Sequence, residues 1–128
     1  MTANEISRVV VDCAVRIHTR LGPGLYESVY ETLMVYELEK AGLRVQRQFP
    51  IPVVYDEIKM DDGFRGDLLV EGIVIVEIKS LEKLAPVHFK QVLTYLRCTG
   101  LQLGILLNFG EHQMKDGMKR IVNGLQDA

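Results

Sequence analysis

Two acids and a lysine on neighbouring apolar segments are the residues of this chain best suited to chemistry. Asp67 lies in one segment, Glu77 and Lys79 lie in the next, and a Glu71-Gly72 break separates the two. Apolar, β-rich runs on either side of a turn signal predict a hairpin. Side chains alternate along a strand, so Glu77 and Lys79 share a face. Charges in such a strand are costly unless they are paired or bound to a metal.

The length of the hairpin loop decides whether Asp67 joins them. A two-residue loop would place Asp67 opposite Val76, on the wrong face. A three-residue loop over 71–73 places it opposite Glu77, and directly opposite residues share a face. Gly72 can supply the positive φ that such a loop needs. The sequence therefore predicts the three-residue loop, with both carboxylates on one face.

Two carboxylates and an ammonium suit the hydrolysis of a phosphodiester with a divalent metal. Asp67 and Glu77, with the backbone carbonyl of Ile78, are the predicted ligands of Mg²⁺ or Mn²⁺, which prefer hard oxygen donors. Lys79 would orient the attacking water, lower its pKa or neutralise charge in the transition state. The alternative is a cross-strand salt bridge among the three side chains, because such triples are common by chance.

Composition limits what these residues serve. The chain has 128 residues, 48% of them hydrophobic and 25% charged, as expected for one globular domain over 1–128. Its formal charge of −2 counts against tight, autonomous DNA binding, but less against a nuclease site whose metal offsets its acids. Cys13 and Cys98 are expected to be reduced thiols. With no signal peptide or membrane-length apolar run, we expect a cytoplasmic protein.

Periodicity and turn signals predict a mixed sheet flanked by helices, in the order α-α-β-β-β-β-α-β-α. Asn4 is the expected cap of the first helix, and Met60-Asp61-Asp62-Gly63 is an expected turn. Pro50 and Pro52 indicate an edge or a bend in the first strand. The predicted helices are Glu5–Arg20, Tyr26–Lys40, Pro86–Cys98 and Met114–Leu125. The predicted strands are Leu43–Phe49, Val53–Ile58, the two hairpin segments and Leu103–Leu107.

Further polar residues have two interpretations each. Glu27 opens the second helix, where an acid favours the helix dipole, and Tyr30 shares its face, which points to the metal site or to solvent. Gln91 and Tyr95 form a polar stripe on the third helix that could hold a phosphate or a metal-bound water, or could simply be solvated.

For two histidines and six cations the sequence is less specific. His88 is expected to be solvated, and His18 suits a helix C-terminus about as well as the site. The candidates for phosphate contacts, which no dense basic run gathers, are Arg16, Arg20, Arg44, Arg47, Lys59 and Arg65.

The order of the motifs resembles a known family. Gly24-Leu25-Tyr26-Glu27-Ser28-Val29-Tyr30 is a Gly-x-x-Glu-x-x-Tyr motif, preceded by the segment 18–24. Arg65-Gly66-Asp67, Val76-Glu77-Ile78-Lys79, the segment 91–96 and the segment 106–110 follow. From about Ile6 to Gly110 the chain resembles the small prokaryotic GxxExxY proteins, a branch of the PD-(D/E)xK nuclease-like superfamily.

The resemblance implies a restriction-endonuclease-like α/β core. It assigns the metal carboxylates to Asp67 and Glu77 and the superfamily's lysine to Lys79. It also brings Glu27 to the metal, often through water, and turns Gln91 and Tyr95 toward the site. One departure is Gly66, which stands where the superfamily has proline.

Three functions follow as hypotheses. The first is a nuclease dependent on Mg²⁺ or Mn²⁺ that acts on nucleic acid, with DNA favoured over RNA, as a monomer or a homodimer. The second is a non-catalytic module that binds nucleic acid or protein and retains the nuclease fold. The third is a structural subunit that self-associates through its final helix.

Overall fold

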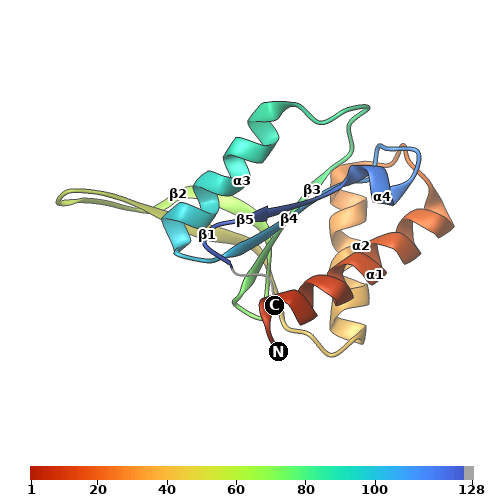
Figure 1. Ribbon diagram of the computed structural model, residues 1–128, viewed down its shortest axis with the longest axis horizontal. Helices are drawn as coiled ribbons and strands as arrows, with labels where there is room; N and C mark the ends of the chain where they lie inside the picture. Colours follow the sequence, from red (N-terminus) through yellow and green to blue (C-terminus); the bar gives the residue numbers. More distant parts are fainter. Residues whose placement is uncertain (126–128) are drawn as a thin grey trace.

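The structure, a computed structural model, describes residues 1–125, and these form a five-stranded sheet between two layers of helices (Figure 1). The sheet order is β1-β2-β3-β4-β5, and only β3 and β4 are parallel. The predicted fold class, a mixed sheet flanked by helices, is confirmed. The strands are β1 (Val45–Tyr55), β2 (Ile58–Val70), β3 (Val74–Lys79), β4 (Leu103–Asn108) and β5 (Met118–Val122). The helices are α1 (Ala3–Leu21), α2 (Glu27–Lys40), α3 (Pro86–Thr99) and α4 (Met114–Gly117).

The two faces of the sheet have separate cores. Helices α1 and α2 pack on one face, where Tyr30, Met34 and Ile78 belong to one buried cluster. Helix α3 covers the other face, where Val92 and Leu96 pack with Ile75 of β3. Strand β4 is buried along its whole length, as its apolar sequence predicted, because helices lie on both sides of it.

Helix α1 begins two residues earlier than predicted. Thr2, not Asn4, is its cap: the Thr2 hydroxyl accepts from the backbone N–H of Glu5 (3.1 Å), and the Glu5 carboxylate accepts from the backbone N–H of Thr2 (2.9 Å). This reciprocal pair is a capping box, which satisfies two backbone donors at once. A single Asn cap would satisfy one.

The β2–β3 hairpin has the predicted register. Leu68 pairs with Val76 and Val70 pairs with Val74, so the loop between the strands has three residues. Glu71 and Gly72 take positive φ angles of 54° and 66° in that loop. Continuing the register by one step puts Asp67 opposite Glu77.

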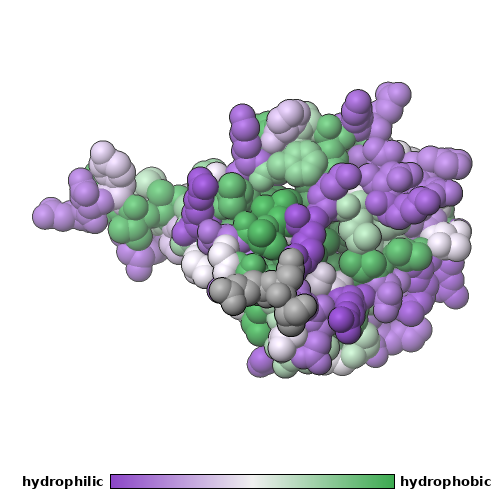
Figure 2. Space-filling view, in the orientation of Figure 1, coloured by the Kyte–Doolittle hydropathy of each residue, from purple (hydrophilic) through white to green (hydrophobic). Residues whose placement is uncertain are grey.

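The first two predicted strands, Leu43–Phe49 and Val53–Ile58, form one strand, β1, as far as Tyr55, so three strands and not four precede α3. Strands β1 and β2 form one long arm that projects from the body, and it turns at Asp56 (φ 52°) rather than at Met60–Gly63 (Figure 1). The residues Met60–Gly63 lie within β2, at a shift in the register between β1 and β2. Strand β1 is an edge strand with that irregularity beside Pro52, as the prolines predicted. Hydrophobic side chains are exposed on the arm (Figure 2), among them Val54, Tyr55, Ile58 and Met60.

The predicted final helix Met114–Leu125 is wrong. Helix α4 stops at Gly117, and Met118–Val122 continue as β5, antiparallel to β4. The apolar spacing fits a helix, but the strand closes an otherwise open edge of the buried β4, and this tertiary pairing overrides the local pattern. A self-associating final helix is therefore not present in the described residues.

Both cysteines are free thiols, as predicted. Burial raises the pKa of the Cys13 thiol, which lies in the α1 core. Among the described helices, none combines the length and the apolar composition needed to cross a membrane.

Candidate active site

Strands β2 and β3 stop pairing through their backbones at the point where the two acids stand. The last ladder pair is Leu68 with Val76. One step further, the backbone N–H of Asp67 donates to Oε1 of Glu77 (2.8 Å), and the backbone N–H of Ile78 donates to Oδ2 of Asp67 (2.8 Å). Each carboxylate thus satisfies a donor on the opposite strand. The predicted neighbourhood of Asp67 and Glu77 is confirmed.

Burial makes this pair of acids costly in its ionised form. Glu77 is only 4% exposed, and burial, together with the negative charge of Asp67, raises its pKa to about 8. Burial also raises the pKa of Asp67, as does the charge of Glu31, although the hydrogen bond from the Ile78 backbone acts the other way. The pair is stabilised when it holds a proton or a cation.

Lys79 lies beside the pair without closing a salt bridge. Its positive charge lowers the pKa of both acids, so it is close enough to interact with them electrostatically. Yet within the described residues its ammonium makes no ion pair with either carboxylate at 4.0 Å or less. The alternative interpretation of the three residues as a salt-bridged cluster is therefore wrong for this structure.

The two acids match the ligand chemistry of a divalent cation. Among residues 1–125, no group of three or more His, Cys, Asp and Glu side chains is placed to hold a metal. Mg²⁺ is commonly held by only one or two carboxylates and keeps several waters. Half-buried Asp67 and buried Glu77 supply two such carboxylates, and neither is paired with a lysine or arginine of the described residues.

Gly66 gives a structural reason for the departure from the Pro-Asp pattern. The ring of buried Phe49, on β1, lies across this position of β2. A β-carbon at residue 66 would lie 2.3 Å from Cε1 of Phe49. The absence of a side chain therefore lets β1 pack closely against the strand that carries Asp67.

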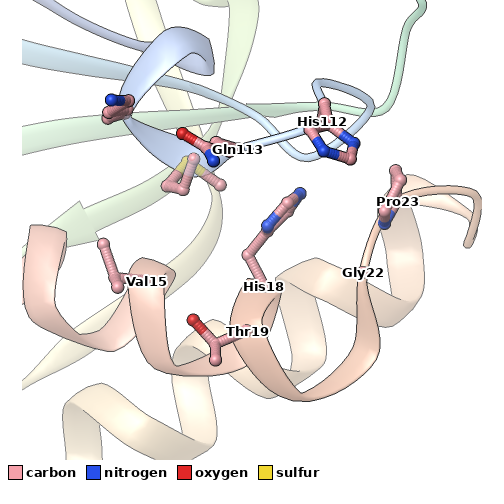
Figure 3. A pocket seen from close by; sticks show the side chains of 9 residues that line it. Val15, His18, Thr19, Gly22, Pro23, His112 and Gln113 are labelled. Carbon is pink, nitrogen blue, oxygen red and sulfur yellow. The ribbon is translucent and has the colours of Figure 1, made fainter.

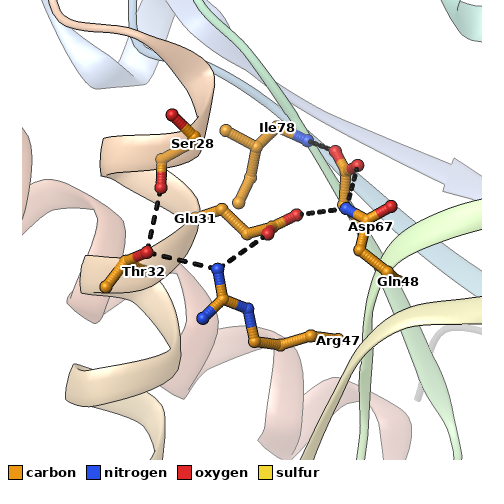
Figure 4. A network of polar contacts seen from close by, with 7 residues as sticks. All are labelled: Ser28, Glu31, Thr32, Arg47, Gln48, Asp67 and Ile78. Carbon is orange, nitrogen blue, oxygen red and sulfur yellow. Dashed lines mark hydrogen bonds and ion pairs between the residues drawn. The ribbon is translucent and has the colours of Figure 1, made fainter.

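Of the four glutamates on α2, Glu27 lies near the end of β3 and Glu31 near Asp67, and sequence reasoning missed Glu31, which is buried. Glu27 is exposed, and its Oε2 lies 3.4 Å from the backbone N–H of Ser80, directly after Lys79. Glu31, one turn later, is 8% exposed. Its carboxylate accepts from Arg47 (3.0 Å) and from Gln48 (2.7 Å), both on β1 (Figure 4). An acid among the apolar positions of α2 was the available signal.

Tyr95 approaches the acids from α3. It is 4% exposed, and burial, followed by the charges of Glu77 and Asp67, raises its pKa to about 12. Its ring also packs against Phe64 at 5.3 Å between centroids. Gln91, one turn earlier on the same helix, is half-buried. The solvated-stripe interpretation is therefore wrong for Tyr95.

The tyrosine of the Gly-x-x-Glu-x-x-Tyr motif has a structural role. Tyr30 is fully buried, so it faces neither the acids nor solvent. Its hydroxyl donates to the Gly22 carbonyl (2.6 Å) and accepts from the Leu25 backbone N–H (3.2 Å), and its ring stacks on Phe109 at 4.2 Å. The hydroxyl of Ser80 donates to the Leu25 carbonyl (2.6 Å). The motif thus ties the bend before α2 to the end of β3.

The two histidines lie away from the acids. His18 is 7% exposed, and its Nε2 lies 2.8 Å from the Glu111 carbonyl. It lines a pocket between the end of α1 and the loop before α4, which His112 also lines (Figure 3). His88 is half-buried and accepts from the Ala85 backbone N–H, so it caps α3 rather than being solvated. Neither is part of the acid site.

Most of the expected phosphate-binding cations are engaged elsewhere. Arg65 donates to the Gln48 carbonyl (3.0 Å). The ion pairs are Arg16–Glu37, Arg44–Glu71, Arg47–Glu31 and Lys59–Asp61. These contacts limit how many of the cations are available to a phosphate.

Comparison with known proteins identifies the family. A family model described as the PD-(D/E)XK nuclease superfamily matches residues 4–121. The chain belongs to the PD-(D/E)XK nuclease superfamily. The match spans nearly the whole sheet, including Asp67, Glu77 and Lys79. This membership indicates a nuclease-type function and a nucleic-acid substrate. No curated protein matches the chain, and no solved structure does so either.

Proposed function

We propose that this PD-(D/E)XK protein is a nuclease of the GxxExxY branch that requires Mg²⁺ or Mn²⁺ and hydrolyses phosphodiester bonds. The observation that carries the proposal is the neighbouring pair of half-buried Asp67 and buried Glu77, with which no lysine or arginine of the described residues forms an ion pair. Superfamily membership supports the reaction class. The branch rests on the motif around Glu27 and Tyr30, and DNA remains favoured over RNA.

The residues that would hold the metal are the carboxylates of Asp67 and Glu77 and the backbone carbonyl of Ile78. Glu27 of α2, whose carboxylate lies near the Ser80 backbone after β3, would extend this shell through water. When bound, the divalent ion supplies an activated water and neutralises charge on the phosphate. The acids would fix the position of that charge beside Glu77, whose side chain is shielded from solvent.

Three further residues would act on the substrate or the attacking water. Lys79 offers an ammonium that no described acid pairs at 4.0 Å, so its charge is available to orient water and to balance the phosphate. Tyr95, with a pKa near 12, stays protonated at neutral pH and can donate a hydrogen bond. Gln91 would position the water or phosphate from the same helix face.

Cleavage assays test the proposal directly. Labelled single- and double-stranded DNA and RNA would be incubated with Mn²⁺ or with chelator. We expect metal-dependent cleavage by the wild-type protein and by Glu57→Ala, a control at the exposed turn of the arm. Glu77→Ala should be inactive. Equal cleavage by folded Glu77→Ala, or cleavage that survives chelation, would overturn the proposal.

A second candidate is a non-catalytic module that binds nucleic acid or protein. The net charge of −2 and the ion pairs that occupy Arg16, Arg44 and Arg47 favour it. Calorimetric titration with Mn²⁺ separates the two candidates. The nuclease predicts a metal site that Asp67→Asn removes, whereas the module predicts no such site. A homodimer is compatible with either and is tested by light scattering.

A further inference from the structure

A row of polar side chains crosses three strands of the sheet at the acid site. On β1, Arg47 pairs with Leu68 and Phe49 pairs with Gly66, so Gln48 stands opposite Asp67. Asp67 in turn stands opposite Glu77 on β3. Cross-strand neighbours are within reach of one another. Gln48 is therefore the neighbour of Asp67 on β1, on the side of Asp67 away from Glu77.

The Gln48 amide is in contact with two carboxylates. Its Nε2 donates to Oε1 of Glu31 (2.7 Å) and to Oδ1 of Asp67 (3.4 Å), and Figure 4 shows the amide between the two acids. A primary amide nitrogen has two hydrogens, so both contacts can be made at once. Oδ2 of Asp67 already accepts from the backbone N–H of Ile78, so the Gln48 amide donates to the other oxygen, Oδ1.

Glu31 makes the position of this amide definite. Its other oxygen, Oε2, accepts from Arg47, which also donates to Thr32 on the same helix (Figure 4). The buried Glu31 carboxylate thus accepts from Arg47 through one oxygen and from the Gln48 amide through the other. The chain of contacts runs from α2 through Gln48 to Asp67.

The backbone of Gln48 is unusual in a way that a merely structural glutamine does not explain. Its φ is +46°, a left-handed conformation that glycine and asparagine adopt more readily than glutamine. The residue is also exposed, so burial does not hold it in this conformation. Strained backbone held in place by surrounding contacts is concentrated at functional sites. Arg65 contributes one such contact, to the Gln48 carbonyl.

We propose that Gln48 is a positioning residue of the metal site: its side-chain amide, anchored by Glu31, orients the Asp67 carboxylate for the cation. This role rests on the proposed metal-dependent function. Gln48 does not bind the metal itself. Partners that orient ligands in this way typically change metal affinity by about 10- to 100-fold when they are removed.

The left-handed conformation provides a substitution that separates position from stability. Gln48→Gly relieves the backbone strain but removes a hydrogen bond to buried Glu31, so two opposing effects should leave the net change in stability small. We nevertheless expect its Mn²⁺ affinity, measured by calorimetry, to fall about 10-fold or more. Gln48→Asn, which tolerates the same backbone but has a shorter side chain, should also bind more weakly. A residue needed only for folding would not produce weaker metal binding in a protein that is still fully folded at the temperature of the titration.

Asp56→Gly is the matched control, because Asp56 also has positive φ (52°) but lies at the turn of the arm. It relieves the same kind of backbone strain and should keep wild-type Mn²⁺ affinity. If Gln48→Gly binds Mn²⁺ as tightly as the wild type while Asp67→Asn does not bind, the positioning role is wrong and the metal site stands. If the wild type binds no Mn²⁺, the proposed function fails and this role fails with it.

Discussion

Two pairs of acids with buried or half-buried side chains have different partners in this molecule. On α2, Glu31 and Glu37 each contact an arginine, at 3.0 Å and 2.8 Å respectively. At the centre of the sheet, Asp67 and Glu77 accept from backbone N–H groups and form no ion pair within the described part of the chain, and their pKa values are raised. The two acids on α2 thus each have an arginine partner within the protein. We infer that the fold leaves the other pair for a cation from solution.

The largest expected effect is on catalysis. Asp67→Ala and Lys79→Ala should each lower cleavage by roughly 10²–10³ or more, because the mechanism is almost wholly electrostatic. Initial rates with Mn²⁺ measure this, with circular dichroism to show that each variant is folded. Wild-type cleavage by folded Lys79→Ala would remove the lysine from the mechanism while leaving the acids in it.

The next effect is a dependence of stability on pH in the metal-free protein. Glu77 titrates near pH 8 when folded and near its ordinary value of about 4.3 when unfolded. Between these values the folded state binds more protons, so the free energy of unfolding decreases as pH rises, by on the order of 5 kcal/mol in total. Below the unfolded pKa the stabilisation is fully present.

Thermal melts from pH 5 to pH 8.5 measure this dependence. Glu77→Gln, which cannot ionise, should flatten the slope, and Mn²⁺ should restore stability to the wild type at high pH. Stability that rises with pH in the chelated wild type would show that the pair is not destabilised by its charge, and the contrast with α2 would be lost.

A smaller effect is expected when an arginine partner is removed. Arg16→Ala leaves Glu37 buried without its cation and should lower the melting temperature by several degrees. Because this acid does not belong to the site, Mn²⁺ should not reverse the loss. Rescue by Mn²⁺ would mean that any buried acid here can recruit a metal.

The smallest effect is expected at an exposed pair. Glu71 accepts from Arg44 at the hairpin loop, where the Arg44 side chain is 89% exposed and solvent screens the interaction. The melting temperature of Glu71→Gln should match that of the wild type within error. A clear decrease would indicate that the hairpin register depends on this pair rather than on the loop conformation.

How much of the site was predictable depended on how local its determinants are. The register that brings Asp67 to Glu77 follows from a three-residue loop. Gly72 indicates this loop in the sequence, because it readily takes the positive φ that the loop needs. The contacts of Glu31 with Arg47 and Gln48 join α2 to β1, and no spacing in the sequence relates them. They become visible only when the helix packs on the sheet.

The errors in the fold have the same origin. Met60-Asp61-Asp62-Gly63 has the composition of a turn, but the arm turns at Asp56. Strand β2 continues through the four residues, where its register with β1 shifts. The spacing of Met114, Met118 and Ile121 fits a helix, yet β5 forms because β4 lies beside it. In both cases a pairing with another strand decided between two locally acceptable structures.

The central claim is that Asp67 and Glu77 hold a divalent cation, and anomalous diffraction from crystals soaked in Mn²⁺ tests it most directly. The account predicts a manganese peak within bonding distance of both carboxylates in the wild type, and no peak there in Asp67→Asn. A well-soaked wild-type crystal with no peak between the two acids, or with manganese only at other residues, would contradict it.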